Sequence, residues 1–306
     1  MYTFIVNPNA RSGLGRTLWN DVEYILKEQN IPYQVFFTKY QHHATSLILG
    51  LTADQERRTI IVLGGDGTIN EVINGITRLD KVTLGYIPIG SSNDFARGMN
   101  LPTDIRAAVR NILTPSRYVH INVGVLSYKD KRRRFAVSAG LGFDAAVCHQ
   151  VMVSPLKVFL NKLKLGKLSY VGVALHRILT LRPQKMTVIL DDSRTLSFEK
   201  VYFATAMNLC FEGGGFKFCP KADCQDDTLD IIVIADISRL KVLALLPTAF
   251  FGWHTRFKGI HIFTCKKVEI ISEKALPVHV DGEPVFLQKQ VEAYLEREKL
   301  CFIGTP

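Results

Sequence analysis

Cysteine is scarce in this chain, and its few copies are widely spread. The 306 residues include six cysteines, at positions 148, 210, 219, 224, 265 and 301, and no two of them form a Cys-x-x-Cys pair. This pattern excludes the disulfide framework that supports small secreted domains and predicts buried free thiols. A metal cluster of Cys210, Cys219 and Cys224 is the alternative, but no histidine or fourth cysteine stands at zinc-finger spacing.

Long hydrophobic runs are also missing. The longest uncharged apolar stretch, Val242–Trp253, contains Pro247 and is shorter than the roughly 20 residues that a membrane-spanning helix needs. The N-terminal apolar run Tyr2–Val6 is short, follows no basic segment and turns at once into Asn-Pro-Asn, which is unlike a signal peptide. We therefore expect a cytoplasmic protein without a transmembrane helix, whose membrane contact, if any, is peripheral.

Acidic residues are outnumbered, at 28 against 38 lysines and arginines, which gives a net charge of +10. Such a charge favours an anionic partner: a nucleotide, a nucleic acid or an acidic membrane surface. A mean hydropathy of +0.11 favours an apolar ligand or a membrane over nucleic acid. The basic residues are dispersed and form no known nucleic-acid module, so we expect no nucleic-acid partner. The apolar content of 47% excludes a disordered chain.

The first 115 or so residues alternate between strand-like and helical patterns. The expected strands are Tyr2–Val6, Tyr33–Phe37, Thr59–Leu63 and Leu84–Ile87, and the helices between them include one around His43–Leu51. Strand, loop and helix in repetition predict βαβ units and a parallel sheet. The strands are unbroken apolar runs, as is typical of strands covered on both faces.

The pattern changes near Arg117, where we place a domain boundary. The expected strands beyond it are Tyr118–Leu126, Phe135–Ala139, Met186–Leu190, Leu196–Ala206, Leu229–Ala235, Lys267–Ser272 and Val291–Leu295. Most are joined by turns, apart from helical stretches within Ser154–Leu181 and a short helix near Ser238–Leu246. The sequence thus predicts a β-rich, mainly antiparallel second domain over residues 118–296. The first domain covers 1–117, and whether the tail at 297–306 returns to it stays open.

Three loops rich in glycine or small residues follow strands of the first domain. They are Asn7–Arg16, Gly64–Thr68 and Gly90–Arg97. Open α/β sheets bind ligands at the carboxyl ends of their strands, and glycine with a following helix N-terminus suits a phosphate. A strand-to-helix turn often needs glycine anyway, but three such loops on one sheet favour a nucleotide site. Neither a Walker P-loop nor a dinucleotide fingerprint occurs in them.

Acidic side chains in phosphate-binding loops need an explanation. Asp66 and Asp94 would repel a nucleotide directly, and a divalent cation between them and the phosphates removes that conflict. Asp94 could instead cap the helix that follows. Near the end of the chain, Asp281-Gly282-Glu283 lies between two strand-like segments, where Asp-Gly is also an ordinary hairpin signal.

These motifs together resemble the diacylglycerol kinase catalytic-domain family, which includes bacterial soluble lipid kinases and the sphingosine and ceramide kinases. The resemblance lies in Gly64-Gly65-Asp66-Gly67-Thr68 and Pro88–Arg97, and continues through Gly140–Ala145, Asn208 with Gly213–Gly215, Pro220–Ala222 with Asp226-Asp227, and Asp281–Glu283. The Gly-Gly-Asp-Gly-Thr motif alone is shared with NAD kinases and phosphofructokinases. The run Ser91–Arg97 distinguishes the lipid branch.

The resemblance implies an ATP-binding α/β domain, a β-rich lipid-binding domain and an active site in the cleft between them. It implies Asp281 as general base on a lipid hydroxyl. Glu283, two residues on, would point to the same face if the segment is extended, where it would orient the acceptor or serve as a weaker base. The nucleotide-binding residues that we expect are Asn7, Asn9, Arg11, Gly13, Arg16, Gly64, Gly65, Asp66, Gly67, Thr68, Glu71, Ser91, Ser92 and Asn93. ATP is the expected co-substrate, and Mg²⁺ is the expected cofactor.

The chain departs from the family at three points. Ser91-Ser92 replaces a threonine pair and keeps the hydroxyls, and Thr228 replaces a glycine in the Asp226-Asp227 segment. The resemblance places a structural Mg²⁺ on Asp227 with the carbonyls of Cys224 and Leu229, and a second metal network on Asp66 and Asp94. A third acidic member of that network is Asn122 here, which keeps an acceptor but loses a charge.

A lysine-rich apolar stretch predicts contact with lipid. Lys157, Lys162, Lys164 and Lys167 alternate with leucine, valine and phenylalanine, as in helices that lie on anionic membranes. The alternative is a helix packed on its own domain. Lys131–Arg134 is expected to form a solvated hairpin tip, with a patch for lipid headgroups as the alternative. We thus expect a lipid substrate, with diacylglycerol first; an NAD kinase, a weakly active membrane-binding regulator and a homodimeric state remain open.

Overall fold

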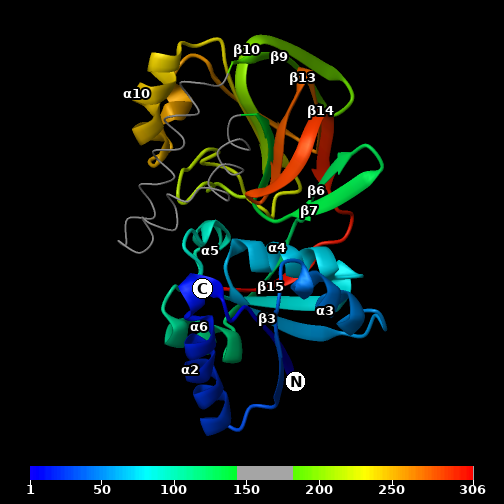
Figure 1. Cartoon of the computed structure of the whole chain (residues 1–306), viewed down its shortest axis with the longest axis vertical. Helices are drawn as coiled ribbons and strands as arrows, with labels where there is room; N and C mark the ends of the chain where they lie inside the picture. Colours follow the sequence, from blue (N-terminus) through cyan, green and yellow to red (C-terminus); the bar gives the residue numbers. More distant parts are fainter. Residues whose placement is uncertain (143–181, 306) are drawn as a thin grey trace. The chain divides into compact units, whose positions relative to one another are not determined.

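The computed structural model describes residues 1–142 and 182–305, and the chain divides into two compact units (Figure 1). Unit 1 comprises Met1–Val123 and Glu296–Pro306, and unit 2 comprises Gly124–Leu295. The helical stretches expected within Ser154–Leu181, with their lysines, lie outside the described residues, as do Cys148 and residues 143–145 of the Gly140–Ala145 motif. Among the helices that the structure describes, none is long and apolar enough to cross a membrane.

Unit 1 is built on a six-stranded sheet in the order β2-β1-β3-β4-β15-β5. The strands are β1 (Tyr2–Val6), β2 (Tyr33–Phe37), β3 (Arg58–Gly64), β4 (Val82–Pro88), β5 (Arg117–Ile121) and β15 (Leu300–Gly304). Strands β1 to β4 pair in parallel, and β15 is parallel to β4 but antiparallel to β5. The predicted N-terminal sheet of mostly parallel strands is therefore confirmed, and the C-terminal tail adds a strand to it.

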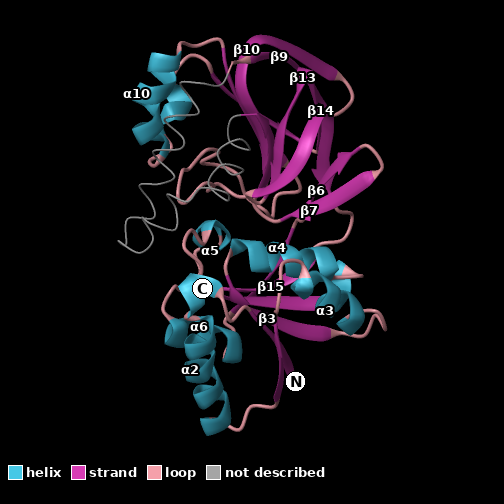
Figure 2. Cartoon of the chain, viewed as in Figure 1, coloured by secondary structure: helices cyan, strands magenta, loops and turns pink. Residues whose placement is uncertain are grey.

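Helices cover both faces of this sheet (Figure 1). They are α1 (Ala10–Gly13), α2 (Gly15–Glu28), α3 (His43–Leu51), α4 (Asp66–Gly75), α5 (Asp94–Gly98) and α6 (Ile105–Leu113), with a 3-10 turn at Leu79–Lys81. On one face, α2 buries Trp19, Val22 and Leu26 against Phe4 of β1. The ring centroids of Phe4 and Trp19 lie 5.1 Å apart in an edge-to-face arrangement, which suits aromatic packing. Helices α3 and α4 pack together on the other face (Figure 2).

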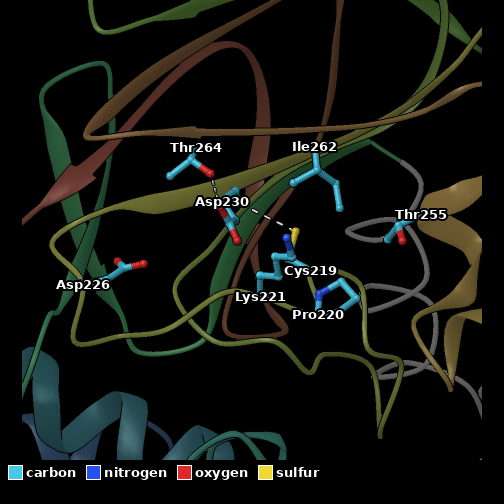
Figure 3. Close-up of a pocket in the computed structure, with 8 residues that line it drawn as sticks. All are labelled: Cys219, Pro220, Lys221, Asp226, Asp230, Thr255, Ile262 and Thr264. Atoms are coloured by element: carbon cyan, nitrogen blue, oxygen red, sulfur yellow. Dashed lines mark hydrogen bonds between the residues drawn. The ribbon is translucent and has the colours of Figure 1, made fainter.

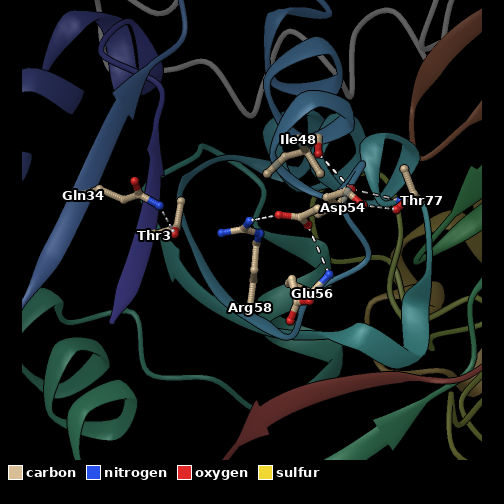
Figure 4. Close-up of polar contacts among 8 residues, drawn as sticks. Thr3, Gln34, Ile48, Asp54, Glu56, Arg58 and Thr77 are labelled. Carbon is tan, nitrogen blue, oxygen red and sulfur yellow. Dashed lines mark hydrogen bonds and ion pairs between the residues drawn. The ribbon is translucent and has the colours of Figure 1, made fainter.

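Hydrogen bonds fix the connections between these elements (Figure 4). The hydroxyl of the buried Thr52, just after α3, donates to the carbonyl of Ile48 at 2.9 Å and accepts the N–H of Thr77 at 3.1 Å. Thr52 thereby ties the end of α3 to the loop that follows α4. Asp54 forms an ion pair with Arg58 at the start of β3, which helps to set where that strand begins.

Unit 2 is a β domain, and the strands that the structure describes in it pair antiparallel, as predicted. Its strands are β6 (Gly124–Tyr128), β7 (Lys131–Phe135), β8 (Ser138–Gly142), β9 (Gln184–Leu190), β10 (Arg194–Met207), β11 (Leu229–Ala235), β12 (Ile260–Cys265), β13 (Lys267–Val280) and β14 (Glu283–Leu295). The long strands β10 and β13 each pair with β9 in one half and β8 in the other. This pairing closes the sheet around a core that includes Phe135, Leu141, Val188, Val233 and Val278. Helix α10 (Arg239–Ala249) and a 3-10 turn, η2 (Trp253–Arg256), lie beside it.

The region between residues 117 and 142 differs from the sequence-based expectation. The single strand expected over Tyr118–Leu126 is two strands, β5 and β6, which belong to different sheets. The chain leaves unit 1 through the buried Asn122 and Val123, so no exposed segment marks the change. The compact units therefore divide at Val123, beyond the expected boundary at Arg117.

The expected hairpin tip at Lys131–Arg134 is wrong. These residues form β7, which pairs with β6, and the tip is made by Lys129 and Asp130. Strand β7 ends the strand order of its sheet, and charged side chains on an edge strand keep other chains from pairing with it. The basic run is thus an edge-strand feature.

Candidate active site

The three glycine-rich loops follow β1, β3 and β4, which are neighbours in the sheet of unit 1. Asn7, directly after β1, connects the first two loops. Its backbone N–H donates to the carbonyl of Leu63 at 2.9 Å, and its side-chain Nδ2 donates to Oγ1 of Thr68 at 3.1 Å. Its Oδ1 accepts the N–H of Asn9 at 3.0 Å, which shapes the first loop. Asn7 thus positions both loops.

The second and third loops approach each other at two glycines. A Cβ atom placed on Gly90 would lie 2.7 Å from the Cα of Gly65, and one placed on Gly65 would lie 3.3 Å from the Cα of Gly90. Only residues without a side chain allow two backbones to come so close. The structure therefore brings the expected nucleotide-binding residues of the second and third loops together.

The first loop contains a tight, left-handed turn. Arg11 and Ser12 have φ values of 53° and 60°, and Gly13 follows at 93°. The guanidinium of Arg16 lies 4.0 Å from the centroid of the Phe37 ring in a cation–π arrangement. Arg11 is exposed at the start of α1. Arg16 thus packs on Phe37 while it stays exposed, and the loop presents both Arg11 and Arg16 to solvent.

Asp66 holds the N-terminus of α5. Its two carboxylate oxygens accept the backbone N–H groups of Asp94 and Phe95, each at 3.2 Å. A carboxylate at this position satisfies N–H groups that have no partner within the helix and interacts favourably with the helix dipole. The sequence suggested a capping role for Asp94, and the structure gives that role to Asp66.

A buried tyrosine lies beside the same two carboxylates. The hydroxyl of Tyr86 on β4 donates to the carbonyl of Gly64 at 3.2 Å, at the start of the second loop. Burial raises the pKa of Tyr86 well above its usual value, and the charges of Asp66 and Asp94 raise it further. Tyr86 is therefore a neutral donor that fixes the loop. Its short apolar strand gave no sequence signal for this role.

Glu71 also has a structural task that the sequence did not reveal. Its two carboxylate oxygens accept the N–H groups of His42, at 2.8 Å, and Ala44, at 3.1 Å, at the beginning of α3. The hydroxyl of Thr45 donates to the Glu71 carbonyl at 2.9 Å. Glu71 therefore joins α4 to α3, and contact with a nucleotide stays a prediction for it.

The third loop presents hydroxyls and is closed by an asparagine. Ser91 is exposed, Ser92 and Asn93 are half-buried, and Asp94 is buried. Asn93 adopts a φ of 52°, and its Nδ2 donates to the carbonyl of Gly90 at 3.0 Å. The loop thus keeps the two serine side chains at the end of β4, where the sequence predicted phosphate contacts.

In unit 2, Asp281 lies in the turn between β13 and β14. Its Oδ1 accepts the N–H groups of Val137, at 2.8 Å, and Ser138, at 3.0 Å, and its Oδ2 accepts that of Ala136 at 2.8 Å. The N–H of Asp281 donates to the Ser138 carbonyl at 2.8 Å. Three peptide N–H groups therefore hold this carboxylate against the segment that leads into β8.

The segment that holds Asp281 is itself fixed by Asn208. The Asn208 side chain donates to the carbonyl of Ala136 at 2.8 Å, and its backbone N–H donates to the carbonyl of Val137 at 2.8 Å. Asn208 is almost fully buried. The Asn208 motif noted in the sequence thus supports the Asp281 motif through two peptide carbonyls.

A buried histidine and glutamate lie behind the same turn. Gly282 donates its N–H to Nδ1 of His279 at 3.3 Å, and Nε2 of His279 lies 3.2 Å from Oε1 of Glu212. Because Nδ1 accepts a hydrogen bond, its partner nitrogen Nε2 carries the proton toward Glu212. Neither residue was predicted from the sequence. For His279, one local signal was available. Side chains alternate between the two faces of a strand, so His279 lies on the opposite face of β13 from Val278 and Val280.

Glu283 opens β14, opposite Val280 of β13, and its side chain is half-buried. Asp281 has a φ of 49° and Gly282 a φ of 77°, so the two form a tight turn of the kind that the sequence Asp-Gly favours. The turn therefore brings the two carboxylates of the Asp281–Glu283 motif into one short segment of unit 2.

The segment expected to hold a structural Mg²⁺ forms a turn before β11. Asp226 accepts the N–H of Thr228 at 2.9 Å and its hydroxyl at 2.8 Å. The positive φ of this turn, 64°, falls at Asp227 and not at Thr228. The exchange of glycine for Thr228 therefore costs no backbone strain, and the hydroxyl adds a hydrogen bond.

The donors of this segment are oxygens rather than thiolates. Burial raises the pKa of the Cys224 thiol to about 12, and that of Cys219 well above its usual value. Among the described residues, no three metal-ligating side chains come together. Asp227 with the peptide carbonyls of Cys224 and Leu229 stays the predicted ligand set, and oxygen donors of this kind suit Mg²⁺.

A pocket of about 470 Å³ lies next to this turn (Figure 3). Asp226 and Asp230 line it, together with Thr264, whose hydroxyl donates to Asp230 at 2.6 Å. Burial raises the pKa of Asp230. The pocket is therefore a polar recess in the wall of unit 2.

Two family models match this chain. The family described as "Diacylglycerol kinase catalytic domain" matches residues 1–124, and the family described as "YegS C-terminal NAD kinase beta sandwich-like domain" matches residues 137–290. A Bacillus subtilis protein described as "Putative lipid kinase YtlR" is 33% identical over 285 residues, 92% of each chain. The chain belongs to the diacylglycerol kinase catalytic-domain family.

Two diacylglycerol kinases and one NAD kinase also match over nearly the whole chain. A diacylglycerol kinase of Mycobacterium tuberculosis is 28% identical and covers 94% of this chain and 93% of its own. A Bacillus anthracis structure titled as a "putative diacylglycerol kinase" matches with a TM-score of 0.78 at 25% identity, covering 100% of this chain and 97% of its own. An NAD kinase of Archaeoglobus fulgidus, in complex with ATP, shares the fold at a TM-score of 0.52 and 13% identity. As a member of the kinase family, the chain is a phosphotransferase that uses ATP.

Proposed function

We propose that this kinase transfers the γ-phosphoryl group of ATP to the free hydroxyl of diacylglycerol, which yields phosphatidic acid and ADP. The observation that carries the proposal is the conjunction of three linked loops in unit 1 with a rigidly held acidic turn in unit 2. The loops supply glycine backbones and hydroxyls for a triphosphate. The turn supplies carboxylates for an alcohol that must lose its proton.

On the nucleotide side, the chain's contribution is positioning. Asn7 and Thr68 hold the first two loops together, and Gly65 and Gly90 let the second and third meet. We assign the phosphates to the N–H groups and hydroxyls of these loops, including Ser91 and Ser92. Catalysis of phosphoryl transfer rests mainly on such positioning and on charge stabilisation. Bound Mg²⁺ would neutralise phosphate charge and would be held through Asp66 and Asp94 in unit 1. A second, structural Mg²⁺ would be held at Asp227 in unit 2.

On the acceptor side, the hydrogen bonds of Asp281 favour Glu283 over Asp281 as the base that deprotonates the lipid hydroxyl. The sequence suggested Asp281, but its two oxygens face three peptide N–H groups. We therefore propose that Asp281 orients the turn and that Glu283 accepts the proton of the lipid hydroxyl. As that O–H bond breaks, the oxygen forms a bond to the γ-phosphorus, and the bond from that phosphorus to the β–γ bridging oxygen breaks to release ADP.

A radiolabelled γ-phosphate transfer assay tests the function. The purified chain is incubated with Mg²⁺ and labelled ATP, and with mixed micelles of diacylglycerol, phosphatidylglycerol or a sphingoid base in separate reactions. NAD⁺ without lipid is a further reaction, because the NAD kinase likeness of the fold favours that acceptor as the second candidate. We expect label in phosphatidic acid. Label in NADP⁺ with none in lipid would overturn the proposal and favour an NAD kinase.

A further inference from the structure

Four aromatic side chains are exposed within eight residues, two just after α10 and two in or directly after the 3-10 turn η2. They are Phe250, Phe251, Trp253 and Phe257, with exposed fractions of 43%, 65%, 54% and 42%. We call this set the aromatic patch. Concentrated apolar exposure of this kind is uncommon on a protein surface and usually marks an interaction site. Phe250, Phe251 and Trp253 also form the end of the apolar run Val242–Trp253, which is too short to cross a membrane.

The patch is held in place by buried neighbours. Phe250 stacks on the ring of Phe216, with centroids 4.1 Å apart, and Phe251 stacks on Trp253 at 4.9 Å. Between them, Gly252 has a φ of 72°, and a Cβ there would lie 2.7 Å from Pro220. The buried His254 contacts the Phe218 carbonyl through Nε2 at 3.1 Å. The rings therefore project from an ordered turn.

The chain segment that contains the patch carries positive charge alone, although Thr255 of η2 lines a pocket with Asp226 and Asp230 from another segment. From Ile237 to Val268 the sequence has no aspartate or glutamate. It has Arg239 and Lys241 at the start of α10, and Arg256 and Lys258 around Phe257. Nζ of Lys241 donates to the Lys258 carbonyl at 2.8 Å, so Lys258 and the neighbouring Phe257 lie near the N-terminal end of α10, whereas Phe250 and Phe251 follow its C-terminal end.

We propose that the aromatic patch and its four basic residues dock the protein on the surface of a bilayer that contains anionic lipid. Aromatic rings favour the boundary between headgroups and acyl chains, and lysine and arginine favour anionic headgroups. A second copy of this chain fits less well, because a two-fold contact would oppose the same cations. The proposal extends the proposed function to the membrane surface. It rests on that function in one point, namely that the lipid acceptor lies in this bilayer.

The two tryptophans of the chain allow a direct test. Trp19 is 2% exposed in unit 1, and Trp253 is 54% exposed in the patch. In a Trp19→Phe variant, all tryptophan fluorescence comes from Trp253. With vesicles of phosphatidylcholine and phosphatidylglycerol, we expect a blue shift and quenching by brominated acyl chains, both weakened by salt. An unchanged spectrum with these vesicles overturns the proposal.

Substitutions in the patch test its residues. In the Trp19→Phe background, Phe251→Ala with Phe257→Ala should weaken vesicle binding at least about tenfold, because two rings leave the apolar boundary. Arg256→Gln with Lys258→Gln should weaken binding to anionic vesicles only. The matched control is Tyr24→Ala, at a 68% exposed aromatic on α2 of unit 1, which should bind as before. Equal binding by the patch variant and the control contradicts the proposal.

Two further measurements separate docking from catalysis. The Phe251→Ala/Phe257→Ala variant should keep its turnover of a short-chain diacylglycerol in solution while it loses turnover on vesicles. If the protein binds vesicles but phosphorylates no lipid, the proposed function fails and the docking surface stands. If the variant abolishes a dimer in sedimentation and leaves vesicle binding intact, the patch is a contact between copies and the docking proposal is overturned.

Discussion

Nε2 of His279 lies 3.2 Å from Oε1 of Glu212, and both side chains are buried, at 0% and 7% exposure. Glu212 precedes a turn of three glycines, Gly213–Gly215, and its backbone pairs with that of Phe216. On its other side, His279 accepts the N–H of Gly282. The pair thus connects the glycine turn to the segment that contains Asp281 and Glu283, and it is a positioning element for that segment.

The first prediction concerns this pair. His279→Leu removes the acceptor for Gly282 and the donor to Glu212, and should lower kcat for lipid phosphorylation about tenfold or more while KM for ATP stays unchanged. His279→Gln offers both an acceptor and a donor and should restore most of kcat. Steady-state kinetics on the folded variants measures kcat and the KM for ATP separately.

A second buried histidine of unit 2 is the matched control for that experiment. His254 is 2% exposed and contacts the Phe218 carbonyl, away from the acidic turn. His254→Gln should leave kcat unchanged. If His279→Leu and His254→Gln lower kcat to the same extent, His279 contributes to stability alone. Full activity of His279→Leu beside an inactive Glu283→Gln would also contradict the positioning role.

The second prediction separates Asp281 from Glu283. Asp281→Asn places an NH₂ group where a carboxylate oxygen accepts peptide N–H groups, so at least one buried N–H loses its partner. The cost of such a loss is about 1–3 kcal/mol, and we expect both a lower melting temperature and a lower kcat. Glu283→Gln should leave the melting temperature unchanged and lower kcat about 10²–10⁴-fold, as loss of a general base does.

Thermal melts and phosphate-transfer kinetics on the same preparations decide between the two assignments. If Asp281→Asn melts like the unsubstituted chain but is inactive, and Glu283→Gln is active, Asp281 is the base as the sequence alone suggested. The double variant should be no more active than either single one, since both residues serve one step.

Sequence patterns predicted the elements whose local signals agree with their packing. Tyr2–Val6, Tyr33–Phe37 and His43–Leu51 have the predicted bounds, because each is an apolar run or an amphipathic stretch bounded by turn residues. Strand β12, Ile260–Cys265, was not predicted. Its half-buried side chains lie on an edge strand, where the alternation of buried and exposed residues is weak.

The candidate site was predictable where one short motif contains its residues. The loops around Gly65 and Gly90 are such motifs, and so is the Asp281–Glu283 turn. The partners of these motifs were not predictable, because they are distant in sequence: Asp281 is held by peptide groups near residue 137, and His279 by Glu212. Peptide N–H donors occur at nearly every position, so sequence alone does not show which ones a carboxylate will use.

The third prediction concerns the contact between the second and third loops. Gly90→Ala puts a methyl group within 2.7 Å of the Gly65 backbone, so the loops must separate. We expect KM for ATP to rise about tenfold or more, with a smaller rise for Gly65→Ala, whose Cβ would have 3.3 Å. The control is Gly50→Ala in α3, where no atom lies within 4 Å and alanine favours the helix by about 0.5–1 kcal/mol.

Isothermal titration of a non-hydrolysable ATP analogue with Mg²⁺ measures this effect without a lipid. Gly50→Ala should bind the analogue as the unsubstituted chain does and melt at a slightly higher temperature. Normal affinity of Gly90→Ala would place the nucleotide away from these two loops.

The fourth prediction is a pH dependence of stability that originates at His254. Burial lowers the pKa of His254 in the folded protein, although the hydrogen bond to the Phe218 carbonyl opposes this effect. In the part of the chain that the structure describes, Nδ1 of His254 has no hydrogen-bond partner, so a proton added there would be buried without an acceptor. The unfolded chain, in contrast, takes up this proton near its usual pKa of 6.5.

The sign follows from linkage. Below about pH 6.5 the unfolded state binds more protons at this site than the folded state, so the free energy of unfolding falls as the pH falls through that range. Denaturant titrations at pH 7.5 and pH 5 measure the fall. His254→Gln keeps a donor for the Phe218 carbonyl and removes the titration, so its free energy of unfolding should fall less between the two pH values. An equal fall in both proteins would assign the pH dependence to other groups, and His254 would then bind its proton equally well folded and unfolded.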